Sequence, residues 1–300
     1  MVLKVNNVTK YYGNLCAVDN LSFEVKDGEI FGLLGLNGAG KTTTFRMIMG
    51  LIDDYYGDIT IDGEKINYNI TDKIGFLTEE RSLLLKLTVL EQVTYYGILK
   101  GMDEKEIVER LDYWLDRFNI SEYKNKKIKE LSKGNQQKIQ FISSIIHRPK
   151  LLILDEPFSG LDPVNVELFK EIILELKSEG TSIIFSSHRM EHVELFCEKL
   201  LILVNGKTVL SGNLSDIKEK YKKKNILIAG DIPKDKLERL DGVLSVSEDN
   251  GGYKVSIEDK KYINSIFKAI SKYDNITKFY AQNATLNEIF IDKVGESYDQ

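Results

Sequence analysis

Eight residues near the N-terminus combine glycines, a lysine and a threonine at a spacing suited to binding phosphate groups. They read Gly35-Leu36-Asn37-Gly38-Ala39-Gly40-Lys41-Thr42 and follow a short apolar run at 30–34. Glycines let backbone N–H groups converge on phosphate oxygens, and the N-terminus of the helix predicted from Lys41 adds a positive dipole end. Lys41 would contact the β- and γ-phosphates, and the Thr42 hydroxyl would be a ligand of Mg²⁺. This phosphate loop, between a strand and a helix, predicts triphosphate binding.

Two adjacent carboxylates, Asp155 and Glu156, are the second candidate for chemistry, directly after the apolar run 151–154. Ligands of α/β sheets bind at the carboxyl ends of the strands, so both side chains are expected beside the phosphate loop. Asp155 would hold Mg²⁺ through water, and Glu156 would be the general base for an attacking water. Alone, the pair would fit a solvated strand end equally well, but beside a phosphate loop the catalytic interpretation is the stronger one.

The composition is that of an ordinary globular protein of 300 residues, with 42% hydrophobic and 29% charged residues. A formal net charge of -5 disfavours a general nucleic-acid binder, so no nucleic-acid partner is expected. Two cysteines, Cys16 and Cys197, make no disulfide framework and favour a reducing compartment. Residues 1–7 lack the apolar core of a signal peptide, and no apolar run approaches the roughly 18 residues of a membrane-spanning helix. A cytoplasmic location is therefore expected.

Strands and helices predicted from the hydrophobic pattern must position these residues. Strands are predicted at 3–5, 21–25, 30–34, 59–61, 74–77, 151–154 and 182–185, and a hairpin over 200–210 turns at Asn205-Gly206. Helices are predicted at 41–49, 88–99, 103–118 and 134–147, which makes about 87–147 a helical region. Beyond a composition break near 216, the order strand-helix-strand-strand-helix-strand is typical of a ferredoxin-like domain, and a capping box at Thr285 opens a last helix. The expected domains are 1–215 and 216–300.

Three further motifs give the chain a family resemblance. They are Leu131-Ser132-Lys133-Gly134-Asn135-Gln136-Gln137, then Ser159-Gly160-Leu161-Asp162 after the carboxylates, and His188 at the end of the next apolar strand. With the phosphate loop and Asp155-Glu156, they resemble the ATP-binding subunit of an ATP-binding cassette (ABC) transporter over residues 1 to about 215. The resemblance implies an α/β fold, a P-loop NTPase ABC-ATPase domain with a mixed sheet core and a helical subdomain, followed here by a small α+β ferredoxin-like C-terminal domain. It implies ATP and Mg²⁺ as cofactors, and ATP hydrolysis coupled to transmembrane transport.

Within that family the chain resembles the NatA/YhaQ-like exporter subfamily. The stretches that carry this narrower resemblance are Phe76-Leu77-Thr78-Glu79-Glu80-Arg81, residues 131–137 and Leu286-Asn287-Glu288-Ile289-Phe290. It implies export, of Na⁺ or of a drug or peptide, through a separate integral-membrane permease. The chain itself would be peripheral on the inner face of the cell membrane.

The resemblance also implies roles for single positions. Tyr12 matches the aromatic residue that stacks on adenine, with Tyr11 a lesser candidate and a plain surface aromatic as the alternative. Contacts with ATP are implied for Gly35, Leu36, Asn37, Gly38, Ala39, Gly40, Lys41, Thr42 and Thr43. The signature loop, which closes on ATP bound to a second copy, matches Ser132, Lys133, Gly134 and Asn135. Asp162 would lie at the seam of this head-to-tail homodimer, and His188 would contact the γ-phosphate and orient the water.

Three positions depart from the usual family pattern. Glu79 stands where a glutamine commonly binds Mg²⁺; a carboxylate can also bind the metal, but adds negative charge near the phosphates. Lys133 replaces a glycine, and Asn135 replaces a glutamine. Because Lys41, Asp155, Glu156 and His188 are intact, an active ATPase is expected.

Other interpretations remain open at this point. A soluble ABC ATPase of translation or repair would usually carry tandem cassettes or coiled-coil arms, and neither is visible in the sequence. A low-turnover regulatory nucleotide-binding module is favoured only by Glu79 and the altered signature loop. The apolar segment 83–87 fits a groove for a permease helix and an ordinary core segment equally well. The C-terminal domain would pair with its twin, sense a ligand or simply pack.

Overall fold

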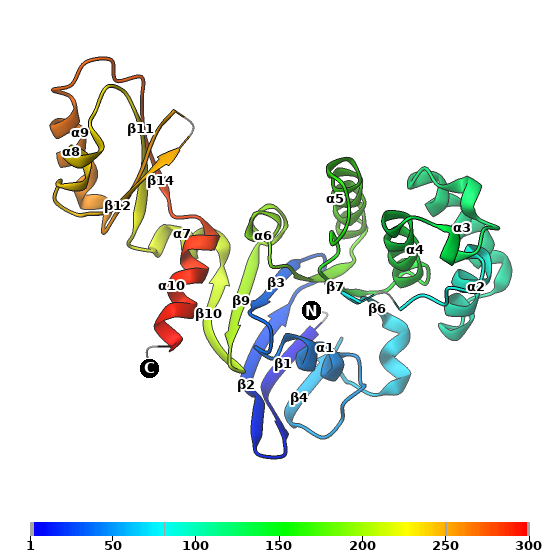
Figure 1. Cartoon of the computed structure of the whole chain (residues 1–300). Coiled ribbons are helices and arrows are strands. Elements are labelled where there is room, and N and C mark those ends of the chain that lie inside the picture. Colours follow the sequence, from blue (N-terminus) through cyan, green and yellow to red (C-terminus); the bar gives the residue numbers. More distant parts are fainter. Residues whose placement is uncertain (1–2, 81, 250, 299–300) are drawn as a thin grey trace. The chain divides into compact units, whose positions relative to one another are not determined.

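The computed structural model describes residues 3–80, 82–249 and 251–298 (Figure 1). Arg81, which belongs to one of the stretches that carry the narrower resemblance, lies outside the described residues. The chain divides into two compact units, Met1–Ser211 and Gly212–Gln300. The sites predicted above all belong to the first unit.

A six-stranded sheet forms the centre of the first unit, with its strands in the order β10-β9-β3-β8-β7-β6. Its members are β3 (Ile30–Gly35), β6 (Ile74–Leu77), β7 (Leu151–Asp155), β8 (Ser182–Ser186), β9 (Lys199–Val204) and β10 (Lys207–Asn213). The neighbours from β9 to β6 are parallel. Every residue of β3, β7 and β8 is buried, as expected for parallel strands covered on both faces. The phosphate loop after β3 and the carboxylates after β7 therefore leave the sheet at the same edge.

A second, antiparallel sheet in the order β2-β1-β4-β5 packs against one face of the first. It is made of β1 (Leu3–Tyr12), β2 (Leu15–Val25), β4 (Tyr56–Ile61) and β5 (Glu64–Lys65). The first two strands are much longer than the predicted segments 3–5 and 21–25. Register shifts near Val8 and Lys10 break the alternation of polar and apolar residues, which hid the full hairpin from the sequence pattern.

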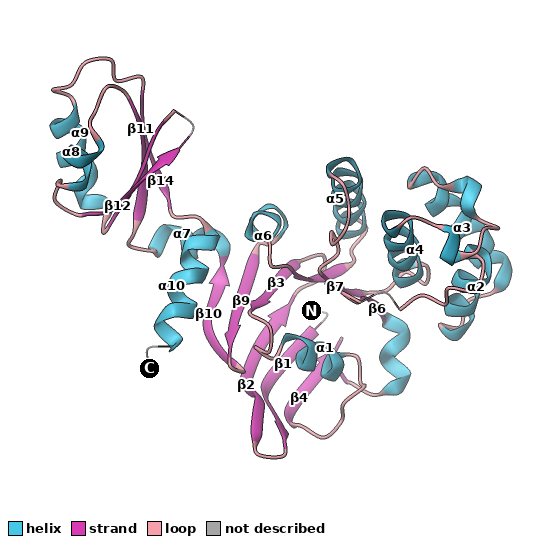
Figure 2. Ribbon diagram, in the orientation of Figure 1, coloured by secondary structure: helices cyan, strands magenta, loops and turns pink. Residues whose placement is uncertain are grey.

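Helices complete the first unit (Figures 1 and 2). They are α1 (Lys41–Ile48), α2 (Val89–Leu99), α3 (Glu104–Arg117), α4 (Lys133–Ile145), α5 (Pro163–Ser178) and α6 (Met190–Phe196). Phe118, Phe141 and Phe169 pack with ring centroids 5.0 to 5.9 Å apart, which joins the helical region to α5. Within the described residues no helix has both the length and the apolar character needed to cross a membrane.

The second unit has an antiparallel sheet in the order β12-β13-β11-β14 (Figure 2). Its elements are α7 (Leu214–Lys220), β11 (Lys224–Ala229), α8 (Lys234–Glu238), β12 (Val243–Asp249), β13 (Gly252–Ile257), α9 (Ile263–Ile270), β14 (Lys278–Asn283) and α10 (Leu286–Tyr298). The predicted fold class, including the ferredoxin-like unit, is confirmed. The capping box is confirmed as well: Glu288 N–H donates to the Thr285 hydroxyl at 3.3 Å, and Thr285 N–H donates to the Glu288 carboxylate at 2.8 Å.

Candidate nucleotide site

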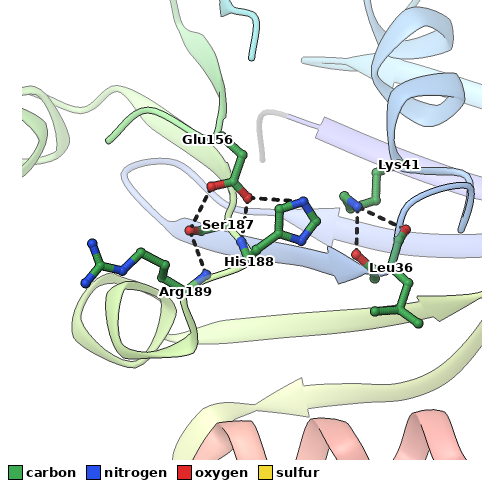
Figure 3. Close-up of polar contacts among 7 residues, drawn as sticks. Leu36, Lys41, Glu156, Ser187, His188 and Arg189 are labelled. Carbon is green, nitrogen blue, oxygen red and sulfur yellow. Dashed lines mark hydrogen bonds and ion pairs between the residues drawn. The ribbon is translucent and has the colours of Figure 1, made fainter. Parts of the chain in front are cut away.

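The backbone conformation of the phosphate loop requires glycine at particular positions. Gly40, just before α1, has a φ of 106°, and a Cβ there would lie 2.6 Å from the carbonyl oxygen of Ala17. Gly38 has a φ of 80°, in the left-handed region that favours glycine. The Lys41 ammonium donates to the carbonyl oxygens of Gly35 at 2.7 Å and Leu36 at 3.2 Å (Figure 3). The lysine that would contact a phosphate is thus folded back onto the loop itself.

A cavity of about 630 Å³ lies against this loop, and we call it the nucleotide cavity. Segments far apart in the sequence supply its lining, which consists of Tyr12, Leu15, Cys16, Ala17, Leu36, Asn37, Gly38, Ala39, Gly40, Lys41, Thr42, Thr43, Glu79, Asp155, His188 and Asn205. The structure therefore brings Tyr12, most of the phosphate loop, Glu79, Asp155 and His188 around one space.

Carboxylates surround the lysine at the base of the cavity. Burial lowers the pKa of Lys41, while the negative charges of Asp155, Glu156 and Glu79 act in the opposite direction. Burial raises the pKa of Asp155, against the opposing charge of Lys41. The hydroxyl of Thr42 and the carboxylates of Asp155 and Glu79 are hard oxygen donors of the kind that Mg²⁺ prefers. Among the described residues there is no group of three or more His, Cys, Asp or Glu side chains that could hold a metal ion.

Glu156 is held in a strained conformation at the end of β7. Its φ is 50°, unusual for a residue with a side chain, and its N–H donates to the carbonyl oxygen of Ser186 at 3.0 Å. Its carboxylate accepts hydrogen bonds from the Ser187 hydroxyl at 3.2 Å and from the backbone N–H of His188 (Figure 3). The His188 Nε2 lies 3.7 Å from Glu156 Oε1. Burial raises the pKa of Glu156 despite these contacts, and this direction is consistent with the general base that the sequence predicts at this position.

The predicted signature loop is not part of this arrangement. Ser132 caps α4 by accepting from the Asn135 N–H at 3.3 Å, and Asp162 caps α5 by accepting from the Asn165 N–H at 2.9 Å. Of the described residues, none from 132–135 lines the nucleotide cavity of its own chain. One copy of the chain thus brings the phosphate loop and Asp155 to the nucleotide cavity, and Glu156 beside the His188 that lines it, whereas the N-terminus of α4 lies outside that cavity.

Two residues that contribute to the site were not predicted from the sequence. Lys10 is buried in β1, where its ammonium lies 4.8 Å from the centre of the Tyr12 ring and donates to the carbonyl oxygen of Asp54 at 2.9 Å. Asn205 lines the cavity from the turn between β9 and β10, and Gly206 N–H donates to the carbonyl oxygen of Ala39 at 3.1 Å. Asn205-Gly206 carried a signal only for a turn, and no local signal marked Lys10.

Comparison with known proteins agrees with this geometry. A family model for ABC transporters matches residues 18–159, and one for the C-terminal domain of DrrA1-3-like ATP-binding proteins matches residues 212–294. The uncharacterized ABC transporter ATP-binding protein YhaQ of Bacillus subtilis (strain 168) is 51% identical over 298 residues, which are 99% of this chain and 100% of YhaQ. The ABC transporter ATP-binding protein NatA of the same organism is 36% identical over 214 residues, 70% of this chain and 87% of NatA.

A solved structure described as the ATP binding subunit of an ABC transporter is also similar. It has a TM-score of 0.69 and 31% sequence identity, and the match covers 74% of this chain and 93% of that one. The chain belongs to the ABC transporter family, as an ATP-binding and ATP-hydrolysing subunit.

Proposed function

We propose that two copies of this chain form the motor of an exporter, on the inner face of the cell membrane, and that a separate integral-membrane permease forms the pathway. The observation that carries the proposal is that the site is one-sided: the phosphate loop of a single chain lines the nucleotide cavity, and the signature loop of that chain does not. The resemblance to NatA-type proteins supports export, of Na⁺ or of a drug or peptide.

A head-to-tail dimer would complete each site. The N-terminus of α4, with the Ser132 hydroxyl and the backbone of Gly134, would face the γ-phosphate held by the other copy. A dipole end and a hydroxyl at this place favour an anion, so ATP would hold the two copies together. Loss of the γ-phosphate would remove the bridge and let the dimer open.

The assigned residues divide the hydrolysis of ATP between them. Glu156 would accept a proton from the water as its oxygen bonds to the γ-phosphorus and the bond to the β,γ-bridging oxygen breaks, which yields ADP and phosphate. His188 would orient that water, since its ring lies next to the Glu156 carboxylate. Lys41 would exchange its carbonyl partners for phosphate oxygens. Mg²⁺, held near Thr42, Asp155 and Glu79, would neutralise charge on the β- and γ-phosphates.

A second cavity, of about 460 Å³, offers a place for the permease, and we call it the groove. It lies between β6, α2 and α4, and its lining includes Leu51, Tyr96 and Leu99. Around it Leu84 and Leu85 are exposed, and none of residues 83–87 is buried, so this segment is no ordinary core segment. Exposed apolar side chains beside a groove are typical of a surface that receives an amphipathic helix.

A charge in the groove is expected to detach the permease. Leu99→Asp should abolish copurification of the tagged chain with a multi-span membrane protein from detergent-solubilised membranes, because Leu99 is 59% exposed and lines the groove. Mass spectrometry of the eluate measures this. The matched control is Leu174→Asp on α5, where the leucine is 48% exposed and lies outside the groove. A wild-type chain that copurifies with ribosomes or DNA, and with no membrane protein, would contradict the proposal.

Removal of the Tyr12 ring is expected to weaken nucleotide binding. Stacking on a base contributes about 1–3 kcal/mol, so Tyr12→Ala should raise the Kd for ATP by roughly tenfold, and Tyr12→Phe should leave it within about twofold. Tyr11→Ala is the matched control, since Tyr11 is similarly exposed and does not line the cavity. Isothermal titration calorimetry measures all three, and a larger effect at Tyr11 would reverse the assignment.

A further inference from the structure

The segment between β6 and α2 is fixed at its start by a buried glutamine of α4. Gln140 is 4% exposed, and its Nε2 donates to the Thr78 carbonyl oxygen at 3.1 Å, to the Thr78 hydroxyl at 2.9 Å and to the Glu80 carbonyl oxygen at 3.2 Å. The Thr78 hydroxyl also donates to the Glu80 carbonyl. Residues 78–80 thus form a closed turn around Glu79, and one amide attaches that turn to α4.

The end of the same segment is fixed by a second glutamine. Gln92 of α2 is fully buried, and its Oε1 accepts a hydrogen bond from the Leu84 N–H at 2.9 Å. Both glutamines line the groove, whereas Glu79 lines the nucleotide cavity. The segment therefore borders both cavities.

Strand β6 itself rests on α4 and on the residues that follow it. A Cβ at Gly75 would lie 2.2 Å from the carbonyl oxygen of Ser144, so the strand backbone touches the helix backbone there. The His147 ring places Nε2 3.1 Å from the carbonyl oxygen of Ile74. Of the described strands, β6 is the last in the order of the six-stranded sheet and pairs with β7. Its position and that of Glu79 consequently depend on α4, the helix that begins at the signature loop.

We propose that Gln140 is a positioning residue that ties the Glu79 carboxylate to the signature helix. When α4 moves to meet the nucleotide of the second copy, the Gln140 amide moves the turn at 78–80 with it. The turn then places the Glu79 carboxylate near Thr42 and Asp155, where Mg²⁺ would bind. This movement of α4 rests on the proposed function above. Because the turn is closed by its own Thr78–Glu80 hydrogen bond, loss of Gln140 detaches the turn without unfolding it.

A double-mutant cycle on the purified full chain tests this link. Gln140→Leu should lower kcat about five- to tenfold, Glu79→Ala should do the same, and the double variant should be no slower than either. The matched control is Lys138→Met, also on α4. Lys138 is 6% exposed, and the change removes the hydrogen bond of 3.1 Å that its ammonium donates to the Phe118 carbonyl oxygen. It should leave kcat within about twofold, since residues in separate contacts behave independently.

A binding measurement separates positioning of Glu79 from general damage. Calorimetric titration with ATP, with and without Mg²⁺, should show that Gln140→Leu reduces the gain in affinity due to Mg²⁺ and leaves metal-free binding unchanged. Additive effects in the cycle, or an unchanged Mg²⁺ gain, would overturn the proposal. Should Gln140→Leu fail to fold, Gln140→Met, which keeps the length of the side chain, removes the amide donor and leaves the Thr78–Glu80 hydrogen bond in place, enters the same cycle. The two proposals can fail separately. A wild-type complex whose turnover is not stimulated by the permease would refute the proposed function. The double-mutant cycle needs no permease, and it alone decides the role of Gln140.

Discussion

Replacement of Glu156 by glutamine is expected to stop ATP hydrolysis and leave ATP bound. Glutamine has the same shape. Its amide oxygen can still accept from the His188 N–H, and its NH₂ group can donate to the Ser187 hydroxyl oxygen, so the strand end should keep its conformation. It cannot take a proton from the attacking water, and loss of a general base typically costs about 10²- to 10⁴-fold in rate. Phosphate release from Glu156→Gln should therefore fall by at least about 100-fold.

The same variant should also accumulate as an ATP-bound dimer. If ATP holds two copies together and hydrolysis separates them, blocked hydrolysis shifts the population to the closed state. Size-exclusion chromatography with ATP, followed by analysis of the retained nucleotide, measures this. Glu191→Gln is the control, because that carboxylate lies nearby in α6 and is 84% exposed. Turnover by Glu156→Gln above about a tenth of the wild-type rate would show that another group is the base.

Sequence reasoning succeeded where the chemistry depends on neighbours in the chain. The glycines of the phosphate loop are needed for its local backbone, and the buried strand 151–154 directly precedes Asp155-Glu156. The parallel pairing of β3, β8 and β7 then brings both motifs to one edge of the sheet. The structure accordingly places Lys41, Asp155 and His188 around the same cavity, as their positions after apolar strands indicated.

The contacts that could not be predicted from the sequence join segments that lie far apart along the chain. Gln140 and Thr78 are 62 residues apart, and no pattern in either segment indicates that one amide joins them. The contact of Lys10 with the Tyr12 ring forms in the second half of β1. The sequence pattern did not predict that half as a strand, because register shifts interrupt the alternation of polar and apolar residues. The left-handed backbone of Glu156 follows from its bond to β8, since glutamate has no preference for that conformation. These contacts are set by tertiary packing, which local propensity does not encode.

A mixture of two inactive variants is expected to regain activity if each site is shared between chains. Lys41→Ala removes the charge at the phosphate loop, and Gly134→Asp places a carboxylate where the signature loop would meet the γ-phosphate. The second change fits the fold, since a Cβ at Gly134 would have only Leu161 nearby, at 3.9 Å. Each variant alone should hydrolyse ATP at least about 100-fold more slowly than the wild type.

In a mixed dimer the lesions fall in the same site only if the site is shared. The Lys41→Ala loop then faces the Gly134→Asp signature loop, and the opposite site contains the normal parts of both chains. Random pairing makes about half of the dimers mixed, each with one intact site, so an equal mixture should reach about a quarter of wild-type turnover. Had each chain a complete site of its own, every site would carry one lesion and the mixture would stay inactive. A phosphate-release assay on the separate and mixed variants decides between the two, and recovery would show that the loop at 35–42 acts only when a second copy faces it.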